Sequence, residues 1–90
     1  MNTSFWFGRN SELFDVQLQF SREEVNRHSI VLANICEVMQ PQGQPLDFPF
    51  QGNATMQIHN IVPLDDGRVL MRIQIDFERR LNYRLGVVIL

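Results

Sequence analysis

Cys36, His28 and His59 are the residues from which nucleophilic or metal-dependent chemistry would have to be built. A cysteine nucleophile needs a histidine base beside it, and that base needs an orienting partner. Cys36 lies in an apolar run, where a cysteine usually packs as a small buried hydrophobe. A metal site needs three or four ligands at compatible spacing, which two distant histidines and one cysteine do not provide. We therefore predict no catalytic residue, no metal site and no cofactor, and a function in binding rather than in catalysis.

Polar side chains near the C-terminus offer a different chemistry, that of a binding surface. If the strands described below lie in one sheet, its polar side presents Gln57, His59, Arg72, Gln74, Asp76 and Arg84. Such a face could contact a protein partner or a small polar ligand. A small-molecule or catalytic site around His59, Arg72 and Arg84 is therefore the alternative function. A plain solvated sheet face explains the same pattern, because one side of an antiparallel sheet commonly faces water.

Length and composition limit the class of protein. The chain has 90 residues, 44% of them apolar and 20% charged, which is typical of one soluble folded domain over residues 1–90. No apolar run approaches the ~18 residues of a membrane span, and residues 1–10 lack the features of a signal peptide. With its single cysteine, the chain is expected to be cytoplasmic. A net charge of −2 argues against nucleic acid as a partner.

The C-terminal third carries the clearest strand signal. Residues 68–78 (RVLMRIQIDFE) and 82–90 (NYRLGVVIL) both alternate between apolar and polar side chains, the period-two pattern of half-buried strands. A hairpin through residues 79–81 would pair Phe77 with Tyr83 and Ile75 with Leu85. The same register sets Asp76 opposite Arg84, an opposite-charge pair.

Residues 54–64 (ATMQIHNIVPL) predict a further strand, with its apolar residues inward: Met56, Ile58, Val62 and Leu64. Asp66-Gly67 then predicts a two-residue hairpin turn. That turn would pair Val62 with Met71 and Ile58 with Ile75. Asn60 interrupts the inward row and suggests either a β-bulge or a buried hydrogen bond. Pro63 lacks an amide proton, so the strand is expected to be an edge strand near its end or to be broken there.

Two segments near the N-terminus are also expected to be extended. Residues 13–20 (LFDVQLQF) alternate strictly and predict a strand with Phe14 and Phe20 on its inward side. Residues 4–7 (SFWF) predict a short strand or an arm, turned back by Gly8-Arg9-Asn10.

Residues 21–43 (SREEVNRHSIVLANICEVMQPQG) permit two interpretations. Ser21 with Glu24 is a capping box, and the apolar positions that follow fit one side of a helix over residues 22–39. The β-branched residues and the Pro41–Gly43 turn signal instead favour a single helical turn near residues 21–28 followed by a strand, with a type I turn over residues 40–43. This second interpretation folds residues 35–39 back against residues 44–50.

The favoured fold class is therefore mainly β, a small antiparallel sandwich or barrel of six to seven short strands. The alternative is an α+β fold, ββαβββ, with the helix at 22–39 packed on a curled sheet. A chain of this size buries only ~60–65% of its unfolded surface, which favours self-association as a homodimer. The surfaces expected to mediate it are the aromatic arm and the apolar end of the last strand: Phe5, Trp6, Phe7, Val88 and Leu90.

Overall fold

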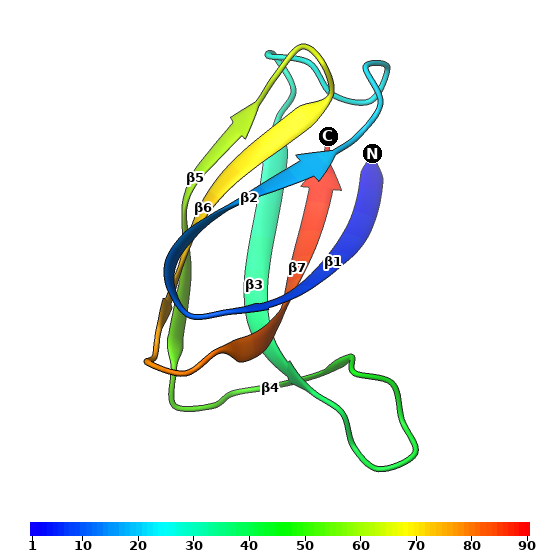
Figure 1. The fold of residues 1–90 in the computed structure, drawn as a ribbon. Helices are drawn as coiled ribbons and strands as arrows, with labels where there is room; N and C mark the ends of the chain where they lie inside the picture. The colour runs from blue at the N-terminus through cyan, green and yellow to red at the C-terminus, as the bar shows by residue number, and fades with distance from the viewer.

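Seven antiparallel strands build the chain in a computed structural model that describes all residues 1–90 (Figure 1). They are β1 (Asn2–Asn10), β2 (Glu12–Gln19), β3 (Val31–Met39), β4 (Phe48–Phe50), β5 (Thr55–Pro63), β6 (Arg68–Asp76) and β7 (Leu81–Ile89). No segment is helical, so the mainly-β prediction is confirmed and the ββαβββ alternative is wrong.

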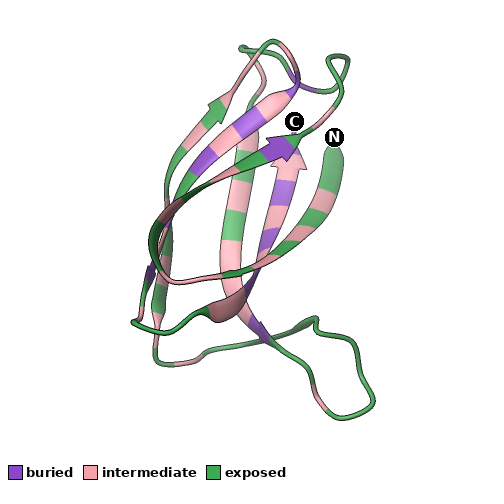
Figure 2. Ribbon diagram, in the orientation of Figure 1, coloured by how far each residue is buried: buried purple, intermediate pink, exposed green.

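The strands form two sheets that face each other. Sheet A has the order β1-β7-β3-β4, and sheet B has the order β2-β6-β5. The two central strands, β6 and β7, supply most of the core, and Figure 2 shows buried residues alternating with more exposed ones along both. Their buried side chains are Val69, Met71, Ile73, Ile75, Tyr83, Leu85, Val87 and Ile89. The predicted alternation of apolar and polar residues is therefore the alternation between core and outer surface.

The pairing predicted between residues 68–78 and 82–90 is wrong. These strands are β6 and β7, which belong to different sheets, so Phe77 does not pair with Tyr83 and Asp76 does not lie opposite Arg84. Each strand has one strongly apolar side. Side by side, the two would need a further layer to cover them, whereas face to face they cover each other, which removes more apolar surface from water.

The segment between β2 and β3 forms a single turn, as the favoured interpretation of residues 21–43 predicts. The Val25 amide donates to the Ser21 carbonyl at 3.1 Å, and the capping box forms through Ser21 and Glu24, whose amide donates to Ser21 Oγ at 3.2 Å. Val25 is fully buried and closes one end of the core. Strand β3 follows and pairs with β4, as predicted, although the turn between them spans 41–44 rather than 40–43.

The β5–β6 hairpin forms, but its turn has three residues rather than two. The Leu64 amide donates to the Arg68 carbonyl at 2.9 Å, and Gly67 adopts a φ of +90°. This is a type I turn followed by a left-handed residue, which shifts the predicted register. The predicted bulge is confirmed between Ile58 and Asn60. Beyond the bulge, the side chains of β5 alternate in the opposite phase, so Val62 faces outward rather than inward. As expected for Pro63, β5 is an edge strand.

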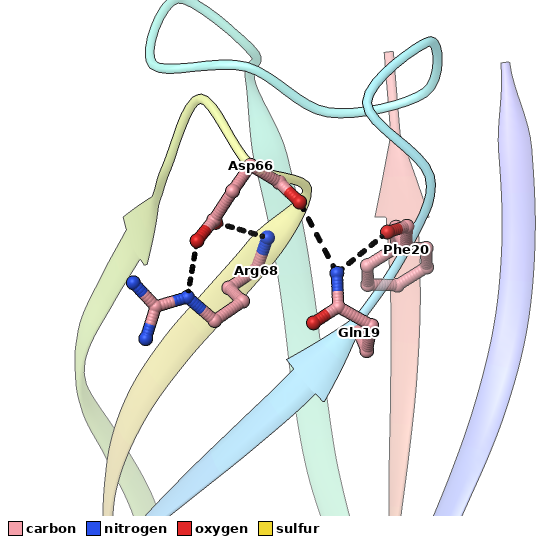
Figure 3. A network of polar contacts seen from close by, with 4 residues as sticks. All are labelled: Gln19, Phe20, Asp66 and Arg68. Carbon is pink, nitrogen blue, oxygen red and sulfur yellow. Dashed lines mark hydrogen bonds and ion pairs between the residues drawn. The ribbon is translucent and has the colours of Figure 1, made fainter.

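Polar contacts of Asp66 hold this turn together (Figure 3). Its carboxylate accepts the Arg68 amide at 3.1 Å and lies 2.7 Å from Arg68 Nε. Gln19 ties the turn to the end of β2 by donating to the carbonyls of Phe20 and Asp66. The main-chain hydrogen bond from Arg68, with the charge of its guanidinium, lowers the pKa of the Asp66 carboxyl below its ordinary value of 3.8.

We expect Asp66→Asn to weaken the acid dependence of stability. A carboxyl whose pKa is lowered by folding stabilises the fold above its unfolded pKa, and that stabilisation is lost as the pH falls through the folded pKa. The wild type should therefore lose stability below about pH 4 more steeply than the variant. Urea unfolding at stepped pH measures this difference. Asp76→Asn, which removes an exposed carboxyl at the far end of β6, is the control, and equal acid slopes for both variants would contradict the expectation.

The first strand is longer than predicted. β1 continues to Asn10, so Gly8-Arg9-Asn10 does not turn the chain back. The reversal occurs at Ser11 and Glu12, where Glu12 has a φ of +61° and the chain passes from sheet A to sheet B. Gly8 lies opposite Tyr83, and a Cβ atom at this position would stand 2.3 Å from the Tyr83 hydroxyl. Glycine at this position therefore lets β1 close against the core.

Candidate interaction face

The outer side of sheet A is the candidate functional surface, and strand register determines which side chains share it. Three rows run across β1, β7 and β3 on this side: Thr3, Val88 and Leu32; Phe5, Gly86 and Asn34; Phe7, Arg84 and Cys36. We call Phe5, Phe7, Leu32, Val88 and Leu90 the apolar face. The first four alternate along their strands with inward-facing residues, and Leu90 directly follows the last residue of β7.

The side chains of the apolar face are unusually open to solvent. The exposed fraction is 58% for Phe5, 52% for Phe7, 54% for Leu32 and 60% for Leu90. Single exposed apolar residues are ordinary, but a contiguous apolar group on one side of a sheet is typical of an interaction site.

Arg84 organises the centre of this side of the sheet. Its guanidinium carbon lies 4.9 Å from the centre of the Phe5 ring, the geometry of a cation–π contact. Gly86 leaves room for the Asn34 side chain, because a Cβ atom there would lie 2.7 Å from Asn34 Oδ1, whereas its 3.5 Å distance to the Phe5 ring would be an ordinary contact. Arg84 Nη1 also donates to Asp47 at 3.2 Å, while its Nε is buried without a hydrogen-bond partner. The Phe5 ring thus has one contact to β7, through Arg84, and is otherwise largely open to solvent.

The loop between β3 and β4 covers part of the outer side of sheet A, away from β1. Asp47, which belongs to that loop, reaches Arg84 on the outer side of β7. Val38 alternates with the inward residues of β3, yet only 3% of its surface is exposed, and it lies outside the main core cluster. The apolar face is therefore open near β1 and bounded by the loop at the far end, where the loop extends at the bottom of Figure 1.

Strand β1 gives this surface an open edge. It pairs with β7 on one side only and is the end strand of sheet A. Its sequence contains no proline and no lysine, and Arg9 is its only charged residue. Natural edge strands are commonly protected by such residues, by bulges or by being short. A nine-residue regular edge strand without them is suited to pairing with another strand.

The structure brings together most of the residues predicted for self-association. Phe5, Phe7, Val88 and Leu90 lie on one side of one sheet, although they come from opposite ends of the chain. Trp6 is separated from them, because alternation turns it inward. Its ring packs against the core and meets Phe20 edge-to-face at 5.4 Å, and its Nε1 donates to Ser4 Oγ. Leu32 was missed, because the pairing of its strand with β7, which places it beside Val88, was not predicted.

The predicted polar face divides between the two sheets. Gln57, His59, Arg72, Gln74 and Asp76 lie on the outer side of sheet B. Arg84 lies on the outer side of sheet A, so the predicted site around His59, Arg72 and Arg84 does not assemble. On sheet B, His59 Nε2 lies 2.8 Å from Gln74 Oε1, and Arg72 Nε donates to Asp15 at 3.0 Å. In both contacts, exposed side chains of sheet B pair with neighbouring side chains of the same sheet.

The side chains singled out for chemistry also lie apart. Cys36 is on the outer side of sheet A, whereas His59 is on the outer side of sheet B, and His28 belongs to the loop before β3. No group of three or more histidine, cysteine, aspartate or glutamate side chains is arranged to hold a metal ion. None of the molecule's secondary structure is a helix of the length and apolarity that crossing a membrane requires.

The chain matches no protein-family model, no curated protein and no solved structure.

Proposed function

We propose that this protein is a non-enzymatic interaction protein that self-associates into a homodimer through the apolar face and the adjoining edge of β1. The observation that supports the proposal is the placement of Phe5 and Phe7, more than half exposed, on an edge strand with one unpaired side. We place the protein in the cytoplasm, as its single cysteine suggests.

The energetics of a small sandwich favour covering this surface. Two sheets of four and three strands bury one side of each, and the outer side of sheet A stays in water. A buried Phe side chain is worth about 1.5–3 kcal/mol relative to an exposed one. Covering the exposed halves of Phe5 and Phe7 in both copies therefore supplies a substantial part of a dimer's stability.

A small polar ligand on sheet B is the less supported function. Without Arg84, the predicted set loses one of its two arginines, and three of the side chains that stay on sheet B already have partners: His59 and Gln74 pair with each other, and Arg72 pairs with Asp15. A protein partner of another kind remains compatible with the same apolar face, and the oligomeric state distinguishes it from a second copy.

The proposal predicts a mass of twice 10.6 kDa by light scattering after size-exclusion chromatography, falling to 10.6 kDa on dilution. Phe5→Ser/Phe7→Ser should weaken the dimer at least ~100-fold, because interface aromatics commonly cost more than 1 kcal/mol each and the double variant removes four per dimer. Leu13→Ser removes a side chain that is 60% exposed on the outer side of sheet B, and it should leave the dimer unchanged.

A wild type that stays monomeric at every concentration would refute the proposal. So would a dimer that Leu13→Ser weakens as much as the double variant does.

A further inference from the structure

We propose that two copies join side by side, with β1 of one copy pairing antiparallel with β1 of the other about a two-fold axis at Trp6. The two four-stranded sheets A then become one continuous sheet across the dimer. This inference rests on the proposed self-association and narrows it to β1. Of the apolar face, Phe5 and Phe7 then lie at the interface, whereas the residues on β7 and β3 do not.

The register follows from the extent of the strand. β1 runs from Asn2 to Asn10, and Trp6 is its midpoint. Only a two-fold axis at Trp6 lets all nine residues of both strands overlap. In that register Phe5 of one copy lies opposite Phe7 of the other, twice in each dimer. Directly opposite residues of antiparallel strands share a side of the sheet, so these four rings meet on the outer side as two cross-strand aromatic pairs.

The charge on β1 supports the same register. Arg9 is the only charged residue of the strand, and a two-fold axis at Trp6 sets it opposite Thr3 of the second copy. The two Arg9 side chains then lie at opposite ends of the pairing, about 20 Å apart at ~3.3 Å per residue. Moving the axis two residues along β1, to Gly8, would bring the two Arg9 side chains closer together and would leave residues 2–5 unpaired.

Stacking of the two outer faces is less compatible with the structure. The β3–β4 loop reaches over the outer side of sheet A, where Asp47 contacts Arg84 and Val38 is covered. A flat second sheet laid on this side would meet the loop before it met the whole apolar face. Side-by-side pairing extends the sheet away from the loop, since β1 and the β3–β4 connection lie at opposite edges of sheet A.

Main-chain edges supply most of the contact area. An aromatic side chain buries ~150–250 Å² when fully covered, and side-by-side pairing covers only the flanks of the four half-exposed rings, so the rings contribute at most about 300–500 Å². A specific interface needs about 1,000 Å² in total. The two nine-residue strand edges, whose main-chain groups would hydrogen-bond to each other, supply the remainder.

A charge exchange tests the register. Thr3→Asp should tighten the dimer by roughly fivefold, because each dimer gains two opposite-charge pairs with Arg9 of the other copy. Thr3→Arg should weaken it by a similar factor, and Thr3→Arg/Arg9→Asp should restore it. The dissociation constant is measured by sedimentation and by the fluorescence of Trp6, the only tryptophan, which lies at the proposed axis. Thermal unfolding of the dilute monomers checks that each variant folds.

A second pair of variants distinguishes side-by-side pairing from stacked faces. Phe7→Lys should dissociate the dimer, whereas Leu32→Lys, on the same side but separated from β1 by β7, should change the dissociation constant less than twofold. Stacked faces require both variants to dissociate it.

The outcomes separate the two proposals. A monomeric wild type overturns both. A dimer that Thr3→Asp and Thr3→Arg affect equally, or that Leu32→Lys dissociates, overturns the β1 pairing and leaves self-association intact. The opposite responses of the two Thr3 variants, with recovery in the double variant, support the pairing.

Discussion

Replacing Gly67 with alanine should destabilise the fold by about 3 kcal/mol or more, from two causes that add. The φ of +90° places the residue in the left-handed region, where a side chain costs ~1–2 kcal/mol. A Cβ atom would also lie 2.3 Å from the main-chain carbonyl oxygen of Phe20, which cannot rotate aside as a side chain would. Relief of that clash must break the hydrogen bond from the Phe20 amide to the Gly67 carbonyl, now 2.9 Å.

Gly43→Ala is the matched control for this prediction. Gly43 also has a positive φ, +76°, but a Cβ atom there would meet nothing within 4 Å. Gly43→Ala should therefore lower the free energy of unfolding only by the cost of the left-handed backbone conformation, about 1–2 kcal/mol. Urea unfolding of both variants at one protein concentration measures the difference. Equal losses would show that the contact between the hairpin turn and the end of β2 does not contribute to stability.

Ile73→Ala should destabilise the protein by about 2–5 kcal/mol, a large part of the ~5–13 kcal/mol expected for a chain of this length. Ile73 is fully buried at the centre of β6, between Phe14 of β2 and Ile58 of β5. Truncation removes apolar contacts and leaves a cavity between two rigid sheets, which can collapse only partly.

Leu70→Ala, on the outer side of the same strand, serves as the control for Ile73→Ala. It should cost less than about 1.5 kcal/mol, because Leu70 is only partly buried. The urea midpoint should fall for Ile73→Ala with an unchanged slope, and a similar fall for Leu70→Ala would mean that the outer side of sheet B is also packed.

Much of the secondary structure could be predicted because its causes are local. The alternation in residues 68–76 reflects the geometry of one strand, and it placed Met71, Ile73 and Ile75 inside correctly. The bulge near Asn60 was predictable because one polar residue broke an apolar row. The turn after Leu64 was located but given two residues instead of three, since Asp66-Gly67 suits both lengths and only the pairing of Leu64 with Arg68 decides between them.

The candidate surface could be predicted only in part. Phe5, Phe7, Val88 and Leu90 were recognisable as apolar residues with no place in a core, but nothing local shows that they lie on the same side of one sheet. Trp6 was grouped with its neighbours because they are consecutive in sequence, although alternation separates it from them. Arg84 was assigned to the wrong sheet because its strand follows β6 in sequence, and consecutive strands are often paired.

The amino-acid sequence by itself determined most of the extended segments, their apolar sides and most of the turns, because these depend on the backbone geometry of neighbouring residues. It left residues 22–39 open between helix and strand, and it placed the first turn too early. Only the tertiary structure decided which strands pair. The apolar sides of β6 and β7 are similar enough that either could line one sheet or face the other, and the choice depends on which arrangement removes more apolar surface from water. That choice sent Arg84 to one outer surface and His59 to the other, and it placed the two ends of the chain side by side in sheet A.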